Sequence, residues 1–371
     1  IDNGICNGAE WKINFKNKIY HESVGFKDLN KKIFLKKNLI YRIWSMTKPI
    51  VSFATMQLIE KKYLSLNDPI DKYLPQFNKI KILEKGAKNI KDVYQSKNIP
   101  TIAQLLCHTA GFSYNSSDNV IGKEYENRKI FHSSAKSLKD EVELISELPL
   151  LFDPGSNWHY SVSIDILARI LEIVTKDNLI NILKENIFSP LNMHDTDFFI
   201  NKKQNESLVT TFEYSKKNNT IKEPKLNIRK LINYAYPSND TKFVRGGHGL
   251  YSTASDYSKF AHMLINGKNE NGKKLIDIET LIKMRSNCLS YKILPLEITS
   301  VNTIKDQHYV NDLDGYGWGY GFRVLLNNTD QNRYGSIGEF GWSGYASTYF
   351  LVDPVNKISG VLMMQILDSE R

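Results

Sequence analysis

Apolar and polar residues alternate near both ends of the chain, a pattern typical of β-strands. Near the start, Trp11, Ile13 and Phe15 alternate with polar neighbours, and apolar residues resume at Tyr20 after a short polar turn. Residues 10–28 therefore predict the two strands of a hairpin.

The last part of the chain returns to strand-like patterns. The turn residues Asp353, Pro354 and Asn356 predict a hairpin between the final two of four such segments. Because strands at both ends flank a helical middle, we expect an α+β fold. Both chain ends would build one antiparallel sheet flanked by helices, with a mainly helical lobe inserted between them. The four segments read GYGFRVLL, YGSIGEFGW, ASTYFLVDP and ISGVLMMQIL.

Residues 46–62 predict a buried helix, because apolar side chains occupy nearly every side of it. Pro49 is tolerated only near the first turn of a helix, so this helix is expected to start at about Ser45.

Three further segments show helical spacing or helix-ending residues. TIAQLLCHTAGF predicts a short helix that Gly111 stops, and STASDYSKFAHMLING predicts a helix that ends at Gly267. SIDILARILEIVTKD predicts another, with Ser163 as its N-cap. The polar stretches 115–145 and 200–245 are expected to form long surface loops.

Composition and charge distribution argue against several functional classes. The chain has 371 residues, 41% of them hydrophobic, and a net charge of +9. Its lysines are scattered and no motif interleaves aromatic with basic residues, so we expect no nucleic-acid partner. No stretch approaches the ~20 apolar residues of a membrane span. No signal peptide is visible, although the sequence starts at Ile1, so a cytoplasmic and a periplasmic location both stay open.

The three cysteines, Cys6, Cys107 and Cys288, form no C-x-x-C pair. Their odd number argues against a disulfide framework, and their spacing against a zinc site. Cys107 lies in an apolar run and is expected to be a small buried side chain. No P-loop, dinucleotide fingerprint or His-Glu-x-x-His run occurs, so we expect no cofactor and no metal.

Ser45 and Lys48 are the best candidates for catalytic residues. Their spacing of three places both side chains on one face of the predicted helix. A serine at a helix N-terminus also lies where the helix dipole stabilises developing negative charge. On this motif alone, however, a capping serine beside a solvated lysine is the simpler interpretation. The same spacing recurs at Ser133 and Lys136 in a polar stretch, where we interpret it as chance.

The order of six segments resembles the serine β-lactamase and penicillin-binding-protein superfamily. Its closest branch is that of the class C β-lactamases and family VIII carboxylesterases. The resemblance implies a β-lactamase-like fold and a single catalytic unit over 1–371. It also implies an α/β lobe at about 1–62 and 251–371, and a helical lobe at about 63–250. The segments are YRIWSMTKPI, LIEKKYLSLNDPIDKYLP, TIAQLLCHTAGF, FDPGSNWHYSVSIDILARI, GGHGLYSTASDYSKFAHMLINGK and GEFGWSGYASTYFLVDP.

The resemblance implies a role for each matched residue. Ser45 would be the nucleophile and Lys48 its proton-handling partner. Tyr160 would share the role of base, because a neighbouring ammonium stabilises the phenolate form of tyrosine. Which of Lys48 and Tyr160 is the base stays open. The backbone N–H groups of Ser45 and Tyr345 would form the oxyanion hole.

The third family motif corresponds here to Trp342, Ser343 and Gly344, with Gly344 allowing a substrate to lie close to the strand. Class C β-lactamases carry a lysine where this chain has Trp342, and an asparagine where it has Val162. Val162 has no polar group to contact the lysine or the substrate amide, and Trp342 has no positive charge to hold a substrate carboxylate. Both departures resemble the esterase branch. From the residues alone, Trp342 could equally be a core aromatic and Tyr160 a surface phenol.

We therefore expect a serine hydrolase that cleaves carboxylic esters with short acyl chains through an acyl-serine intermediate. Its partner would be a small ester or amide substrate, and the protein a monomer or small homo-oligomer. A β-lactamase, a D-amino-acid peptidase or an acyltransferase of the same superfamily is the main alternative. A non-catalytic binder of peptide or peptidoglycan is a further one. His108 and His248 receive no catalytic role, and His159 is expected to point away if Tyr160 points inward.

Overall fold

The computed structural model describes residues 5–16, 18–130, 137–215, 218–236, 244–298, 313–330 and 334–368. The second Ser-x-x-Lys pair, Ser133 and Lys136, lies outside the described residues. The helices are α1 (Thr47–Glu60), α2 (Ile102–Leu106), α3 (Val120–Asn127), α4 (Leu138–Ser146), α5 (Ser163–Thr175), α6 (Leu179–Leu183), α7 (Lys202–Glu206), α8 (Leu226–Ala235), α9 (Ala254–Met263) and α10 (Ile278–Met284).

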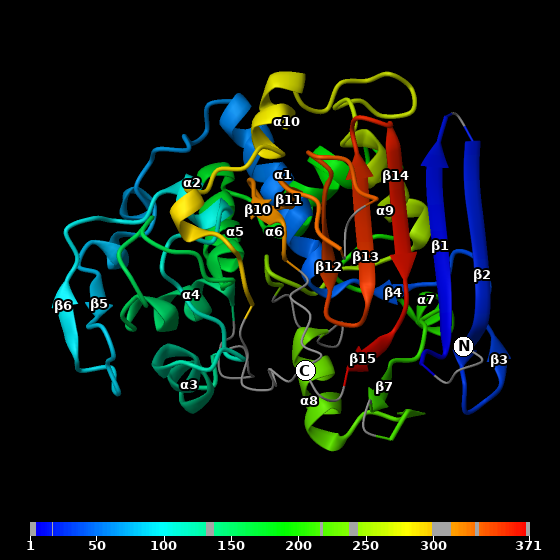
Figure 1. Cartoon of the computed structure of the whole chain (residues 1–371), viewed down its shortest axis with the longest axis horizontal. Coiled ribbons are helices and arrows are strands. Elements are labelled where there is room, and N and C mark those ends of the chain that lie inside the picture. Colours follow the sequence, from blue (N-terminus) through cyan, green and yellow to red (C-terminus); the bar gives the residue numbers. More distant parts are fainter. Residues whose placement is uncertain are drawn as a thin grey trace.

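An eight-stranded antiparallel sheet combines strands from both ends of the chain. Its order is β10-β11-β12-β13-β14-β1-β2-β3, so the first strand lies beside β14, near the end of the chain (Figure 1). This confirms the predicted α+β fold. The strands are β1 (Gly8–Phe15), β2 (Lys18–Asp28), β3 (Ile33–Phe34), β10 (Tyr316–Trp318), β11 (Arg323–Leu325), β12 (Phe340–Gly344), β13 (Thr348–Asp353) and β14 (Ile358–Met363).

The remaining strands form three smaller sheets. These are β4 (Tyr41–Arg42) with β9 (Tyr251–Ser252), β5 (Lys81–Leu83) with β6 (Val93–Gln95), and β7 (Phe212–Ser215) with β8 (Thr220–Lys222) and β15 (Ile366–Asp368).

Both predicted hairpins are present, because β1 pairs with β2 and β13 with β14. Several helix ends differ from the prediction. Helix α2 ends at Leu106, ahead of Gly111, because His108 adopts a left-handed φ of +57° that stops the helix. Helix α9 ends at Met263 rather than Gly267. Ser163 is the first helical residue of α5 and not its cap, which is Val162.

The two polar stretches expected to be loops contain helices, so that prediction was wrong. Helices α3 and α4 lie within 115–145, and α7 and α8 within 200–245, together with β7 and β8. Side-chain caps explain the first pair: Asn119 accepts a hydrogen bond at the start of α3, and Ser137 does so at the start of α4. Each cap satisfies a backbone N–H that a short helix would otherwise leave unpaired.

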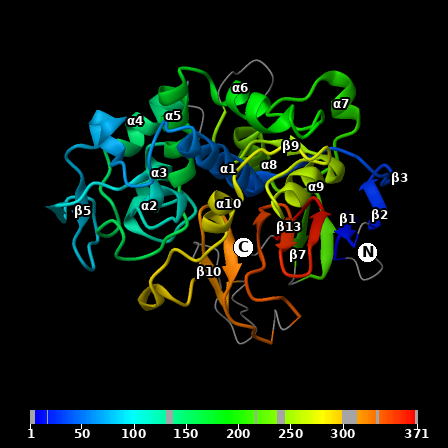
Figure 2. The same cartoon turned by 90° about the horizontal axis from the view of Figure 1, so that it is seen from above.

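Helix α1 runs through the interior, between the helical part of the chain and the sheet (Figures 1 and 2). It packs against α5 and α6, and twelve of its fourteen residues are buried. Helix α9 covers one face of the sheet, where Lys12 Nζ of β1 lies 3.0 Å from Ser255 Oγ. The buried position of α1 follows from its all-round apolar sequence, and it fixes the residues at its start.

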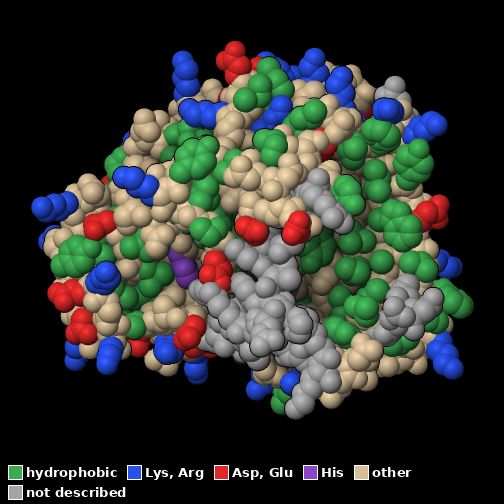
Figure 3. Space-filling model, in the orientation of Figure 1, with side chains coloured by type: hydrophobic (Ala, Val, Ile, Leu, Met, Phe, Trp, Pro, Cys, Tyr) green, Lys and Arg blue, Asp and Glu red, His purple; other side chains and the backbone are tan. Residues whose placement is uncertain are grey.

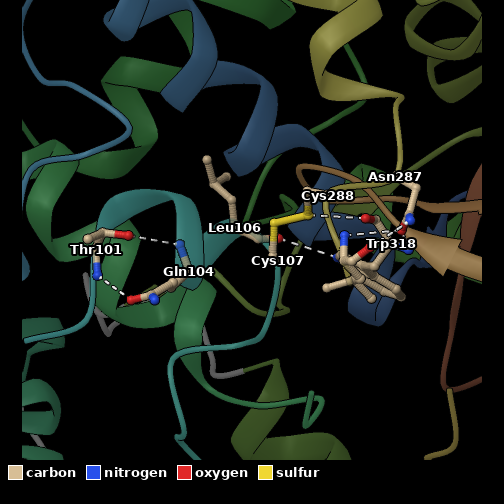
Figure 4. The surroundings of a disulfide bond; sticks show 8 residues. Thr101, Gln104, Leu106, Cys107, Asn287, Cys288 and Trp318 are labelled. Carbon is tan, nitrogen blue, oxygen red and sulfur yellow. Dashed lines mark hydrogen bonds between the residues drawn. A yellow bond between two sulfur atoms is a disulfide. The ribbon is translucent and has the colours of Figure 1, made fainter. Parts of the chain in front are cut away.

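A disulfide joins Cys107 and Cys288, which corrects the expectation that the cysteines would be unpaired (Figure 4). The two residues are separated by 181 positions, so their spacing carries no local signal and only the fold brings them together. The bond connects the residue after α2 to the segment after α10. Cys6 is not disulfide-bonded.

The charged surface agrees with the scattered lysines of the sequence. On the face shown in Figure 3, Lys and Arg side chains are spread out and do not gather in one patch. No helix in the described parts of the chain combines the length and apolar character needed to cross a bilayer.

Candidate active site

Ser45 lies in a short 3₁₀ turn, Trp44–Met46, that leads directly into α1. The preceding residue, Trp44, has a φ of +47°, a left-handed conformation that is uncommon for a bulky residue. Its backbone N–H donates a hydrogen bond to the Tyr236 hydroxyl at 2.6 Å, and its ring packs edge-on against the Tyr236 ring. These contacts hold the backbone in a conformation that costs free energy, immediately before the candidate nucleophile.

Lys48 is the second residue of α1, one turn after Ser45, and its charged end is directed at Ser45. Its Nζ is 3.1 Å from Ser45 Oγ and 2.8 Å from the carbonyl oxygen of Gly247, and it donates to both. The side chain is only 1% exposed. A lysine with so little access to water is held in one geometry by these two acceptors. This excludes the solvated lysine of the simpler interpretation.

Tyr160 lies beside the same ammonium. Lys48 Nζ is 4.7 Å from the centre of the Tyr160 ring and 5.3 Å from that of Tyr114, and the two rings stack at 6.0 Å. The Tyr160 hydroxyl accepts a hydrogen bond from Trp342 Nε1 at 3.1 Å. No direct hydrogen bond joins Tyr160 to Ser45 or Lys48 among these described side chains. The structure therefore brings Ser45, Lys48, Tyr160 and Trp342 into one site.

Strand β12 carries Trp342, Ser343 and Gly344 up to the turn that holds Ser45. A Cβ atom on Gly344 would lie 2.4 Å from the carbonyl oxygen of Ile43, so only glycine fits there. Gly344 therefore makes its close contact with the backbone of Ile43, two residues before Ser45, whereas the sequence predicted a close contact with a substrate. Tyr345 follows directly, and its ring lies 5.4 Å from that of Trp44. Trp44 therefore precedes one predicted oxyanion-hole residue, Ser45, and its ring packs against the other, Tyr345.

Val162 is fully buried, and its backbone N–H donates to the carbonyl of Ser113. Trp342 is 4% exposed and belongs to an aromatic cluster with Trp318 and Tyr160. Trp318 also lies beside the disulfide, since Cys288 Sγ contacts its carbonyl oxygen (Figure 4). The side chains packed around Tyr160 are thus mainly aromatic.

The histidines near the site are held neutral. The ring of His108 lies 4.8 Å from that of Tyr160 and contacts Ser161, and burial, with the charges of Lys48 and His159, holds the pKa of His108 well below its usual range. Burial lowers the pKa of His159 to about 4, and its Nε2 lies against Ser117 Oγ. Burial likewise places the pKa of His248 well below its usual range.

Several charged residues behind Lys48 were missed from the sequence. Asp165 of α5 is fully buried, and so is Glu141 of α4, which forms a bidentate ion pair with the buried Arg245. Asp165 could have been noticed, because a carboxylate lies on the apolar side of a helix between Ile164 and Ala168. Glu141 and Arg245 carry no such signal, because their partners are distant in sequence.

The arrangement suits acyl transfer to a serine. The Ser45 hydroxyl lies at a helix N-terminus, within hydrogen-bond distance of the buried Lys48 side chain, and Tyr160 lies beside that lysine. The end of strand β12 lies close to the turn that holds Ser45. No group of three His, Cys, Asp or Glu side chains in the described ranges is arranged to hold a metal ion.

The family model described as Beta-lactamase matches residues 8–371. Protein Rv1367c of Mycobacterium tuberculosis is 25% identical over 360 residues, which cover 95% of this chain and 84% of that one. Esterase EstB of Burkholderia gladioli is 29% identical over 185 residues, or 48% of this chain and 44% of EstB.

Among solved structures, the chain is similar to EstCE1, described as a hydrolase with promiscuous acyltransferase activity. The TM-score is 0.78 at 22% identity, and the match covers 100% of this chain and 92% of EstCE1. At this identity the likeness establishes the fold. It agrees with the architecture predicted from the two chain ends.

Proposed function

The chain is a serine hydrolase of the Beta-lactamase family, and within that family we propose that it is a carboxylesterase acting on short acyl esters. In this proposal Ser45 is the nucleophile, Lys48 and Tyr160 handle its proton, and the backbone N–H groups of Ser45 and Tyr345 bind the oxyanion.

The proposed reaction has two steps. Ser45 Oγ attacks the acyl carbonyl while its proton passes to Lys48 or Tyr160, and collapse of the tetrahedral intermediate releases the alcohol, which takes that proton. Water then attacks the acyl-Ser45 ester by the reverse sequence, giving the carboxylic acid and free Ser45. General acid–base help of this kind is typically worth ~10²–10⁴ in rate.

The observation that carries this proposal is the hydrogen bond from the buried Lys48 to Ser45 Oγ at 3.1 Å, in a site whose third-motif residue is Trp342. Trp342 offers a neutral N–H and an aromatic face where a lysine would offer a positive charge. Val162, which is fully buried, offers no side-chain group for a hydrogen bond to a substrate. Such a site suits an apolar acyl or alcohol group better than a substrate carboxylate, and the similarity to EstB supports the same preference.

The test compares the kcat/KM of p-nitrophenyl butyrate with that of a chromogenic cephalosporin, using the wild-type chain and a Ser45→Ala control. We expect the ester to be turned over faster, and both activities to require Ser45. Faster turnover of the cephalosporin would reassign the chain to the β-lactamases. Ester turnover that survives Ser45→Ala would remove Ser45 from the mechanism.

Acyl transfer is a second candidate, because the structurally similar EstCE1 is described as having promiscuous acyltransferase activity. In that case an alcohol replaces water in the second step and takes the acyl group from Ser45. Adding an alcohol acceptor to the ester assay and quantifying the new ester separates the two outcomes. A product formed faster than the free acid would favour the transferase.

A further inference from the structure

Asp165 is a buried carboxylate whose position ordinary packing does not explain. It lies in the first turn of α5 and is fully buried. Its Oδ1 accepts the backbone N–H of Gly247 at 2.9 Å, whereas its Oδ2 has no hydrogen-bond partner. Leaving a charged oxygen buried and unsatisfied costs free energy, so a carboxylate is a poor choice for packing alone.

Gly247 connects this carboxylate to the candidate catalytic lysine. Its N–H points to Asp165, and its carbonyl oxygen accepts a hydrogen bond from Lys48 Nζ at 2.8 Å. A Cβ atom on Gly247 would lie 2.5 Å from Asp165 Oδ2, so the carboxylate lies directly against this residue. The position of the carbonyl that holds Lys48 therefore depends on Asp165.

Four buried charged side chains lie together behind the site. Arg245 forms an ion pair with Glu141, with hydrogen bonds of 2.7 and 2.9 Å to its two carboxylate oxygens. Asp165 is the second buried carboxylate, and both Lys48 and Arg245 act on its charge. Val162, nearer to Tyr160 in sequence, has no polar side-chain atom to offer the ammonium.

We propose that Asp165 is a positioning residue for Lys48. Through Gly247 it fixes the carbonyl that orients the Lys48 side chain between Ser45 and Tyr160. This inference rests on the proposed function of Ser45. The titratable and charged groups that act on Asp165 or feel its charge are Lys48 of α1, Tyr125 of α3, Glu141 of α4, Arg245, and Tyr114 in the segment before α3.

The test is the rate at which a serine-reactive phosphonate labels Ser45, measured from pH 5 to pH 10 by peptide mass spectrometry. This readout needs no knowledge of the natural substrate. Asp165→Asn keeps an oxygen that can accept from Gly247 and removes the charge. Asp256→Asn is the matched control. Asp256 lies in the first turn of α9, is also buried, and accepts hydrogen bonds from the backbone N–H of Asp195 and the hydroxyl of Thr196.

In Asp165→Asn we expect labelling at the optimal pH to slow by roughly tenfold or more. The labelling rate of the wild type should change around pH 6, where burial places the pKa of Asp165, and this change should be missing from the Asp165→Asn profile. The Asp256→Asn profile should superimpose on that of the wild type. If Asp165→Asn does not fold, Asp165→Ser takes its place in the same measurement.

Two results would overturn the inference. If wild type is labelled at Ser45 and Asp165→Asn gives the same pH profile, Asp165 does not act on Lys48 and the proposed function stands. If wild type is not labelled at Ser45 at any pH, the proposed function fails, and the inference fails with it.

Discussion

The indole N–H of Trp342 donates a hydrogen bond to the phenol oxygen of Tyr160 across 3.1 Å, joining β12 to the segment before α5. In the proposed reaction this same phenol oxygen is a candidate to take the proton of Ser45. The residue that departs from the lysine of class C β-lactamases thus contacts the candidate base directly.

Trp342→Phe removes this donor and keeps an aromatic ring. A hydrogen bond to a charged group is worth about 1.5–3 kcal/mol, so we expect kcat/KM for the butyrate ester to fall roughly 10- to 100-fold. Trp318→Phe is the control, because Trp318 lies in the same aromatic cluster but donates its indole N–H to the carbonyl of Leu106 (Figure 4). Equal losses in the two variants would show that packing alone accounts for the effect.

Asp165→Asn should also change how stability depends on pH. Burial, together with the nearby Glu141, raises the pKa of Asp165 to about 6, whereas an unfolded aspartate titrates near ~3.9. The folded wild type therefore binds an extra proton between about pH 4 and pH 6, and its stability falls as pH rises through that window. The variant lacks this titration.

The measurement is urea unfolding of both chains at pH 4 and pH 8. The stability difference should move in favour of Asp165→Asn by about 2–3 kcal/mol between these two values. A difference that is the same at both pH values would mean that Asp165 titrates as an ordinary aspartate. Because activity should fall while stability at pH 8 improves, the two effects together separate positioning from support of the fold.

Glu141→Gln should destabilise the fold. The Glu141 and Arg245 side chains are 0% and 5% exposed, and removing one charge of a buried pair costs about 3–5 kcal/mol. Asp277→Asn is the control, since its ion pair with Lys274 is mostly exposed and the urea midpoint should not change. A wild-type midpoint for Glu141→Gln would show that the pair contributes no net stability.

The disulfide should add stability that reducing conditions remove. Closing a loop of 181 residues stabilises the folded chain by about 5 kcal/mol in the loop-entropy estimate, which is an upper value. We expect Cys288→Ser to lower Tm, and the wild type treated with dithiothreitol to lose a similar amount. Cys6→Ser is the control and should leave Tm unchanged. If dithiothreitol leaves the Tm of the wild type unchanged, and Cys288→Ser has the same Tm as the wild type, the disulfide does not stabilise the fold.

Local patterns were sufficient to predict the sheet, whereas the family resemblance was needed to identify the main members of the candidate site. The alternation around Trp11 and the Asp353 turn identified strands at both ends, since a strand leaves a two-residue period in the sequence. Ser45, Lys48, Tyr160 and Trp342 were found because the resemblance assigns each to a short ordered segment. Their catalytic roles stay predictions, as does the division into two lobes.

Features that depend on distant contacts could not be predicted. Cys107 and Cys288 meet only after folding, and nothing in the sequence shows that Asp165 accepts a hydrogen bond from the backbone N–H of Gly247, 82 residues away. The short helices in 115–145 were missed because side-chain caps, rather than long apolar periods, define where they begin.

The central claim is that Ser45 carries the acyl group, and trapping the intermediate tests it most directly. Wild type and Ser45→Ala are mixed with p-nitrophenyl butyrate, quenched in acid within the first turnover, digested and analysed by mass spectrometry. We expect a butyryl adduct on the peptide that contains Ser45 in the wild type and none in the variant. A butyryl adduct on another residue, or ester turnover by Ser45→Ala at the wild-type rate, would contradict the account.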